Sequence, residues 1–530
     1  MIDFEFVFLY ICLIAFLPLI YVTVKTFSWK KLKNKTFRKL LGKDFIRTMP
    51  ICAFVVLPVL IFPEISKSYL IVLQIIFMPL MFLELGHIYL FGTRVGLNTF
   101  YSLFVSNMRE TREFIAQNIP LCLYIGIVAF YLAPFVFLYY LPTPTYSNNV
   151  YKLVAVMIAG IIAIPFVRNL GKKGTKFKDG YVLNPYSNLI YHYLEFKRHY
   201  RDLQQKIACH TSQPFSKISS TLPENQKQTY VILIGESANS MHFSCYGYSR
   251  NTCEFTDAFA DHILSFSNVH SQYAQTMPSL EKALSFADEE HPDLVYTKGS
   301  LIDYFKQAGF KTYWLTNQYA LNDTIITAMT THADYNKCFN YSGMKRFEKA
   351  GIDGDLLPDI RKIINNDETK KVIFVHLIGS HAAYVNRYPS EFRYFSDKMP
   401  NKKLSGTNHQ LLNSYDDSIR YTDWVLSEII RALKQTEGAN YMLYFSDHGE
   451  DVFDTNTTKL LGHSELANEP MTSIPLRLWI SDALEKVRPD IRQRATHLNK
   501  LYKLENLIHF VLDVSSLVNE DYNPKKSILS

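Results

Sequence analysis

The chain has 530 residues, a net charge of +7 and a pI near 8.7. Its length allows more than one domain. A basic chain can bind nucleic acid, but here the basic residues cluster beside apolar stretches, where they can face anionic lipid headgroups. No nucleic-acid-binding motif is present in the sequence, so we exclude nucleic acid as a partner.

The first third of the chain contains five apolar stretches long enough to cross a bilayer as helices. They cover residues 6–24, 49–65, 69–91, 119–141 and 150–167. The second stretch is short and contains Pro50, Pro58 and Pro63. The first stretch has no basic residue before it and no small-residue cleavage site after it, so we interpret it as a retained anchor and not as a signal peptide.

Between the third and fourth stretches, residues 92–118 have the spacing of an amphipathic helix. Phe100, Leu103 and Phe104 would form its apolar side, and Glu110 belongs to its polar side. This pattern predicts a helix near residues 95–117 that lies on the membrane surface, and an ordinary solvated helix face is the alternative.

From residue 229 onward, short β-rich runs alternate with helical patterns such as residues 414–434, which predicts a mostly parallel sheet flanked by helices. Runs 230–234, 371–375 and 441–445 each end in residue types that bind metals or phosphate. The carboxyl ends of parallel strands meet in one crevice, so these residues are expected to share one site. We predict three parts: a transmembrane domain (residues 1–170), a connector (residues 171–228) and an α/β domain (residues 229–530). The connector contains a helical pattern near residues 191–207.

Two of these strand ends carry metal-ligand residue types. Glu236 follows the first run, where a carboxylate can ligate a cation near the backbone or, alternatively, cap a helix. The third run leads into Asp447-His448-Gly449-Glu450, and adjacent oxygen and nitrogen ligands favour zinc or manganese over calcium or magnesium. A polar turn with a hydrogen-bonded histidine is the alternative.

A threonine completes the candidate site. Thr276 lies in Gln275-Thr276-Met277-Pro278-Ser279. A threonine hydroxyl is a poor nucleophile unless a metal lowers its pKa or a base takes its proton. Taken alone, Thr276 would be a helix N-cap. Together with Glu236, Asp447 and His448 it gives three protein ligands and an activated hydroxyl.

Seven motifs from residue 235 onward resemble those of the bacterial lipopolysaccharide phosphoethanolamine transferases. They are Gly235-Glu236-Ser237, Tyr246-Gly247-Tyr248-Ser249-Arg250, Phe266-Ser267-Asn268-Val269, Thr276, Tyr313-Trp314-Leu315-Thr316-Asn317-Gln318, His376-Leu377-Ile378-Gly379-Ser380-His381 and Ser446-Asp447-His448-Gly449-Glu450. Three further segments resemble the branch that acts on lipopolysaccharide core sugars. They are Ala283-Leu284-Ser285-Phe286-Ala287, Pro292-Asp293-Leu294 and Lys306-Gln307-Ala308-Gly309-Phe310-Lys311-Thr312.

The resemblance implies an alkaline-phosphatase or sulfatase-like catalytic domain with one or two zinc ions. It implies Thr276 as the nucleophile, and Glu236, Thr276, Asp447 and His448 as zinc ligands. The implied reaction transfers phosphoethanolamine from phosphatidylethanolamine to lipopolysaccharide, with core heptose favoured over lipid A, through a phosphorylated threonine. The residues that the resemblance places at the substrate are His381, His376, His463, Asn317, Glu110 and Ser106.

The chain departs from the family pattern in three places. One is the local spacing around His463, which is the only candidate for the further active-site histidine that the family has downstream of Asp447. Ala238-Asn239-Ser240-Met241-His242 stands where the family often has an arginine, and no cysteine follows Thr276 closely, as it does in the lipid A branch. The cysteines outside the apolar stretches are Cys209, Cys245, Cys253 and Cys338. They allow two disulfides in any of three pairings, or four free thiols.

Topology gives conflicting indications. The loop between the first two stretches is rich in lysine and arginine, and the positive-inside rule places it in the cytoplasm. With five spans the catalytic domain would then be cytoplasmic, whereas the resemblance implies a periplasmic one. We follow the resemblance and expect a monomeric, multi-pass protein of the bacterial inner membrane. Glu84 and His87, in the third stretch, are expected near the membrane interface.

Four other functions remain open. A sulfatase or phosphatase would share the fold, but Thr276-Met277-Pro278-Ser279-Leu280 lacks the Cys/Ser-x-Pro-x-Arg pattern of sulfatases. A phosphoglycerol transferase would use another lipid donor, and a periplasmic glucan or a protein could be the acceptor. A catalytically inactive membrane scaffold is the alternative from a different class.

Overall fold

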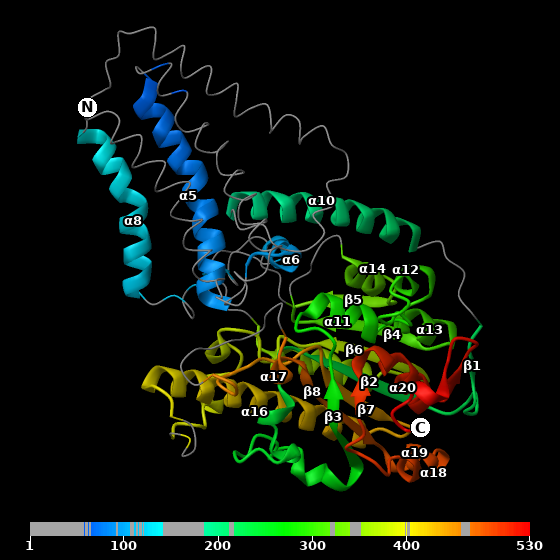
Figure 1. The fold of residues 1–530 in the computed structure, drawn as a ribbon. Helices are drawn as coiled ribbons and strands as arrows, with labels where there is room; N and C mark the ends of the chain where they lie inside the picture. Colours follow the sequence, from blue (N-terminus) through cyan, green and yellow to red (C-terminus); the bar gives the residue numbers. More distant parts are fainter. Residues whose placement is uncertain are drawn as a thin grey trace, which may run out of the picture. The chain divides into compact units, whose positions relative to one another are not determined.

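The computed structural model describes most of the chain after the first apolar stretches. Apart from a few isolated positions, the described ranges are residues 66–91, 94–105, 121–140, 185–210, 217–318, 324–339, 351–397, 403–456 and 467–530. The chain divides into two compact units, which are described separately below (Figure 1). The N-terminal unit contains Met1–Thr111 and Ile115–His199, and the C-terminal unit contains Arg112–Phe114 and Tyr200–Ser530.

The described helices of the N-terminal unit follow the apolar pattern of the sequence. They are α5 (Ser66–Phe91), α6 (Leu97–Val105), α8 (Leu121–Tyr140) and α10 (Pro185–His210), which continues into the C-terminal unit. Among the described residues, one helical segment, Lys67–Leu90 in α5, is long and apolar enough to cross a membrane. α8 coincides with the fourth predicted stretch. The first and fifth stretches and nearly all of the second lie outside the described residues.

Polar side chains of α5 connect it to other parts of the N-terminal unit. The Glu84 side chain is fully buried and accepts hydrogen bonds from Arg94 Nε at 2.5 Å and from Asn188 Nδ2 of α10 at 3.2 Å. His87 Nε2 lies 3.1 Å from the Thr99 hydroxyl of α6. An unpaired carboxylate would be costly in lipid, so these contacts explain how α5 carries Glu84. α6 covers the first part of the predicted surface helix, and residues 106–110 lie outside the described ranges.

The C-terminal unit is built on an eight-stranded sheet. The strands are β2 (Gln228–Gly235), β3 (Ile263–His270), β4 (Lys311–Thr316), β5 (Tyr335–Cys338), β6 (Lys370–His376), β7 (Tyr441–Ser446), β8 (Ser473–Ile480) and β9 (Tyr502–Lys503). Their order is β5-β4-β6-β2-β7-β8-β3-β9. β8 is antiparallel to its neighbours β7 and β3, and the other neighbouring pairs are parallel. The predicted mostly parallel sheet is therefore confirmed, with one reversed strand. A small sheet pairs β1 (Ser219–Ser220) with β10 (Leu517–Val518).

Helices cover both faces of the large sheet (Figure 1). The helices of the C-terminal unit are α11 (Thr276–Ala283), α12 (Leu294–Thr297), α13 (Leu301–Gln307), α14 (Ile325–Thr331), α15 (Leu357–Ile364), α16 (Gly406–Lys434), α17 (Glu469–Thr472), α18 (Asp482–Val487), α19 (Asp490–Arg494) and α20 (Leu507–Val514). In β2, Tyr230, Ile232 and Ile234 pack with α11, α13 and α20, whereas Val231 and Leu233 pack with α15 and α16. Each fully buried large apolar side chain stabilises the fold by roughly 2 kcal/mol, so the central strands are anchored from both sides.

A buried ionic network links α16 to two loops at the carboxyl edge of the sheet. His242 belongs to the short 3₁₀ helix η3 (Ser240–His242), and its Nδ1 lies 2.7 Å from Asp416 Oδ1 of α16. Its Nε2 lies 3.2 Å from Asp454 Oδ1, in the loop after β7. Tyr248 and Arg250 both donate to Asp416 Oδ2, at 2.9 and 2.7 Å. Burial disfavours a charged His242, but Asp454 and Asp416 raise its pKa to about 9.

This network predicts a pH-dependent contribution to stability. Because the pKa of His242 is raised above its usual 6.5, the contribution is fully present below pH 6.5 and is lost as pH rises through about 9. The groups that face the imidazole are the carboxylates of Asp416 and Asp454 and the rings of Tyr248 and Tyr415. A shift of this size corresponds to roughly 3 kcal/mol.

The measurement is the thermal midpoint of full-length wild-type protein and His242→Gln in detergent at pH 6.5 and pH 10. We expect the wild type to be the more stable at pH 6.5 and the gap to shrink at pH 10, because the neutral imidazole no longer balances the two carboxylates. A gap of the same size at both pH values would contradict the assignment of a protonated His242.

Candidate active site

Three neighbouring strands bring the candidate site together at their carboxyl ends. β2 lies between β6 and β7, and Gly235 is paired with Ser446. The residues that follow, Glu236 and Asp447, therefore leave the sheet side by side, and Asp447 N donates to the Gly235 carbonyl at 3.2 Å. On the other side of β2, Ile234 is paired with His376 of β6. The predicted convergence of strand ends is present in the structure.

Glu236, Asp447 and His448 form one buried cluster. Each is at most 2% exposed, and one ligand atom from each lies within 4.8 Å of the other two. His448 Nε2 lies 3.3 Å from Glu236 Oε1 and 3.5 Å from Asp447 Oδ2. Thr276, the first residue of α11, donates its hydroxyl proton to Glu236 Oε2 at 3.1 Å. The structure thus places together all four residues predicted from the sequence.

Hydrogen bonds fix the orientation of the ligand atoms. Asp447 Oδ1 accepts from the backbone N–H groups of Ser237 and His448, at 3.2 and 2.7 Å. Oδ2 of the same carboxylate is buried and has no hydrogen-bond partner among the described residues. His448 Nδ1 lies 2.9 Å from the Gly449 carbonyl oxygen, which favours a proton on Nδ1 and leaves Nε2, the nitrogen that faces Glu236 and Asp447, as the atom that can bind a metal.

The electrostatics of the cluster favour a positive charge at its centre. Burial opposes ionisation of Glu236, but the hydrogen bond and charge of His448 hold the pKa of this carboxyl below its usual range. Burial also disfavours a charged His448, yet Asp447 and Glu236 raise its pKa to about 10. Burial, aided by the charge of Glu236, raises the pKa of Asp447 to about 7. Two buried carboxylates therefore require a cation between them, either a proton or a metal ion.

The donor set suits zinc. Zinc binds histidine nitrogen and carboxylate oxygen with four ligands, and here Nε2 of His448, Oδ2 of Asp447 and the Glu236 carboxylate converge beside the Thr276 hydroxyl. The buried Asp447 oxygen without a hydrogen-bond partner is the observation that fits a metal best, because such an atom is otherwise costly.

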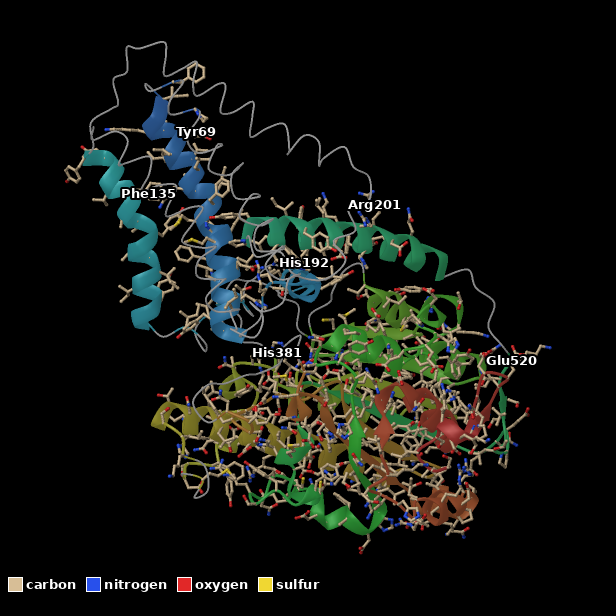
Figure 2. The ribbon with its side chains drawn as sticks, viewed as in Figure 1. Tyr69, Phe135, His192, Arg201, His381 and Glu520 are labelled. Atoms are coloured by element: carbon tan, nitrogen blue, oxygen red, sulfur yellow. The ribbon has the colours of Figure 1, made fainter. Side chains whose placement is uncertain are left out.

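Two further histidines lie at the end of β6, the other neighbour of β2, and in the loop that follows it. His376, the last residue of β6, is 7% exposed, and burial lowers its pKa to about 4, so the ring is neutral at pH 7. Its Nε2 and Nδ1 of His381 are buried without hydrogen-bond partners among the described residues. The His381 carbonyl accepts from Arg387 Nε at 3.0 Å, which holds the loop. His381 is labelled in the C-terminal unit in Figure 2. Both rings therefore have a nitrogen available for a ligand.

The remaining predicted site residues are placed differently. Asn317, after β4, donates its amide to Asp353 Oδ1 at 2.9 Å and to the Gly351 carbonyl at 3.1 Å. His463, Glu110 and Ser106 lie outside the described residues. The role of each at the substrate stays a prediction.

The structure also assigns supporting roles that the sequence pattern did not reveal. Gln318 donates to Glu236 Oε2 at 3.1 Å and to the Leu377 carbonyl at 2.9 Å. Asp353 accepts from the backbone N–H groups of Ile378 and Gly379, each at 2.9 Å. Gln318 belongs to a motif quoted above, but its sequence position does not indicate that it would contact Glu236. The sequence around Asp353 likewise does not indicate which loop its carboxylate would contact.

Gly379 explains how the β6 loop approaches the cluster. Its φ is +51°, and a Cβ atom there would lie 2.8 Å from both the backbone N and O of Glu236. Only glycine fits such a close approach without displacing Glu236. Ser380 N then donates to the Glu236 carbonyl at 2.9 Å, so the two loops are joined directly.

Comparisons with known proteins identify the family. The family model described as Sulfatase matches residues 228–516, more than half of the chain. The phosphoethanolamine transferase EptC of Escherichia coli K12 is 28% identical over 493 residues, covering 89% of this chain and 84% of that protein. The phosphoethanolamine transferase CptA of Salmonella typhimurium LT2 has the same identity and coverage.

Two solved structures are similar to this one. The C-terminal periplasmic domain of E. coli EptC, solved in complex with zinc, is 31% identical, with a TM-score of 0.55, and covers 60% of this chain and 90% of that one. The integral membrane lipooligosaccharide phosphoethanolamine transferase A of Neisseria meningitidis matches 99% of this chain and 97% of its own, with a TM-score of 0.70 and 19% identity, which shows a shared fold. The chain therefore belongs to the sulfatase family and, within it, to the bacterial phosphoethanolamine transferases.

Proposed function

We propose that this protein transfers phosphoethanolamine from phosphatidylethanolamine to lipopolysaccharide, with Thr276 as the nucleophile. The observation that carries the proposal is the position of the Thr276 hydroxyl, 3.1 Å from Glu236 and beside the Glu236, Asp447 and His448 cluster. The names of the similar EptC and CptA proteins support phosphoethanolamine as the transferred group. The segments that resemble the core-sugar branch favour core heptose over lipid A as the acceptor.

Glu236, Asp447, His448 and Thr276 would hold zinc in the active protein. A zinc ion there supplies a positive charge that lowers the pKa of the threonine hydroxyl and neutralises charge on the phosphoryl oxygens. Ser237 Oγ donates to Glu236 Oε1 at 2.9 Å and Gln318 donates to Oε2, so both oxygens of this carboxylate are oriented. These contacts fix the carboxylate before substrate binds.

The reaction has two displacement steps at phosphorus. In the first, Thr276 Oγ forms a bond to phosphorus, the bond from phosphorus to the glycerol oxygen breaks, and diacylglycerol leaves with the proton lost by the threonine. In the second, an acceptor oxygen forms its bond to phosphorus, the bond to Thr276 Oγ breaks, and the acceptor proton returns to the threonine. Thr276 is the first residue of α11, and the N-terminus of a helix favours a negatively charged group such as the phosphoryl group.

His376 and His381 are proposed to contact the phosphoryl group or to ligate a second zinc ion. A neutral imidazole can donate one hydrogen bond and accept another, and the low pKa of His376 keeps this ring neutral near pH 7. Each ring has a buried nitrogen without a hydrogen-bond partner among the described residues, which supports a ligand there.

The location that we propose is the bacterial inner membrane, with several spans and the catalytic domain in the periplasm. Support comes from α5, which is apolar enough to cross a membrane, and from the similar E. coli domain, which is periplasmic. Periplasmic placement gives the site access to a lipid headgroup and to lipopolysaccharide. Domain limits of 1–170, 171–228 and 229–530 and a monomeric state are part of the same proposal.

The nucleophile is tested by Thr276→Ala. We expect transfer to fall by at least about a thousandfold, because the alanine has no oxygen to attack phosphorus, while Thr276→Ser keeps measurable activity. The measurement is mass spectrometry of lipopolysaccharide from cells that express each variant, separated into lipid A and core fractions. The matched control is Thr297→Ala, the same change at an exposed threonine.

A phosphoethanolamine mass increment in the core fraction that is lost with Thr276→Ala supports the proposal. An increment in the lipid A fraction alone would show that lipid A, and not core heptose, is the acceptor. An increment that persists in Thr276→Ala would remove Thr276 as the nucleophile. If wild-type cells show no increment in either fraction, glucan or protein acceptors, another lipid donor and an inactive scaffold become the functions to test.

The metal site is tested by zinc content. We expect about one zinc or more per wild-type chain, and a loss of most of it in Asp447→Asn and His448→Gln, because each change removes one ligand from a small set. Zinc is measured by elemental mass spectrometry on the purified full-length protein. Asp482→Asn is the control, since that side chain is 79% exposed. Equal zinc in all four proteins would exclude this cluster as the binding site.

A further inference from the structure

The loop between residues 244 and 253 closes on itself through four hydrogen bonds at its base. Ser244 Oγ accepts from the backbone N–H groups of Thr252 and Cys253, at 3.2 and 2.9 Å. In return, Thr252 Oγ1 accepts from Ser244 N at 3.0 Å and donates to the His242 carbonyl at 2.7 Å. The two ends of the loop are therefore held side by side by the fold itself.

Each end of this closed loop carries a cysteine. Cys245, in η4 (Ser244–Tyr246), and Cys253 are eight residues apart, and their Sγ atoms are 3.3 Å apart. Cys253 is fully buried, whereas Cys245 is exposed to solvent. The hydrogen bond with Cys245 lowers the pKa of the Cys253 thiol to about 7; burial opposes this shift, and the positive charge of Arg477 adds to it. A thiolate at this position would be a competent nucleophile.

Among the cysteines whose side chains the structure describes, Cys338 is the remaining one, and it lies elsewhere in the fold. Cys338, at the end of β5, donates to the Gln318 carbonyl at 3.3 Å. β5 is one edge strand of the large sheet, whereas β3, the strand that follows the 244–253 loop in the chain, lies next to the strand at the other edge. The side chain of Cys209 lies outside the described residues. Of the pairings that the sequence allows, the structure therefore favours one.

We propose that Cys245 and Cys253 form a disulfide in the mature protein. A disulfide-bonded thiol oxidoreductase is the oxidant. The Sγ atom of the exposed Cys245 forms a bond to one sulfur of that disulfide, whose own S–S bond breaks. The Cys253 thiolate then attacks Cys245 Sγ, and the bond between Cys245 and the oxidant breaks. One S–S bond forms in this chain, the two cysteines lose two protons and two electrons, and the oxidant is reduced to a dithiol. Such oxidation in cells rests on the periplasmic location proposed above.

The bond would stiffen a loop that supports the active site. Tyr248 and Arg250 lie inside the loop, and both donate to Asp416. Asp416 contacts His242, which contacts Asp454, and Asp454 Oδ2 accepts from Asn239 Nδ2 at 3.3 Å. Asn239 also donates to the Glu450 carbonyl at 3.2 Å, in the same loop as Asp447 and His448. The disulfide therefore fixes the outer end of a chain of contacts that reaches the metal-binding loops.

The first experiment maps the bond by mass spectrometry. Cells that express full-length protein are treated with an alkylating agent before lysis, and the digested protein is analysed without reductant. We expect a peptide pair linked through Cys245 and Cys253, lighter by two hydrogens than the reduced pair, with Cys338 alkylated. The same analysis is done on purified protein in detergent after incubation with oxidised glutathione. Alkylated Cys245 and Cys253 in both samples, or a link from either cysteine to Cys209 or Cys338, would overturn the proposal.

The two samples separate this proposal from the proposed location. If the link forms with oxidised glutathione but not in cells, the cysteine pair is supported and the periplasmic placement fails. A link in both samples supports both. Neither result depends on phosphoethanolamine transfer, so the activity of Thr276 variants is tested separately.

The second experiment measures the effect of the bond on stability. We expect reductant to lower the thermal midpoint of the wild-type protein by about 5 °C, because a short covalent loop restricts the unfolded chain. Cys245→Ser, which cannot form the bond, should show no shift with reductant, and Cys338→Ser should behave like the wild type. A shift of equal size in Cys245→Ser would assign the redox effect to other residues.

Discussion

The parallel pairing of β2 with β6 and β7 is the constraint on which the site depends. Parallel neighbours end at the same edge of a sheet, and the register that pairs Gly235 with Ser446 brings Glu236 next to Asp447 through backbone pairing alone. Both faces of these strands are buried, so the register cannot slip without exposing an apolar face. The core therefore positions the carboxylates, and the ligand geometry follows from the hydrogen bonds of the loops.

Thr276 reaches the cluster from a different direction. It begins α11, which follows β3 on the other side of the reversed strand β8. The nucleophile and the three metal-ligand residues thus belong to separate segments that meet only in the folded unit. The fold can hold two buried carboxylates close together because the His448 ring and the Thr276 hydroxyl contact Glu236 and compensate for its burial.

The apolar runs at 230–234, 371–375 and 441–445 predicted β2, β6 and β7 within two residues, because strands buried on both faces are continuously apolar. The direction of β8 was not predictable, since alternation and apolarity carry no information on strand direction. The helix predicted at 414–434 begins earlier, at Gly406, because Ser405 caps it and its first turns are polar. Glu236, Asp447 and His448 could be found from their positions after strands, and Thr276 from its motif. Gln318 and Asp353 could not, because their contacts depend on how distant loops fold.

The left-handed turn at Gly379 has a consequence for redesign of the enzyme. The loop between His376 and His381 crosses the backbone of Glu236 so closely at Gly379 that no side chain fits between them. A loop that is grafted at this position therefore has to bring its own glycine at the crossing point. The limit on such grafts is set by backbone volume and not by the chemistry of the new side chains.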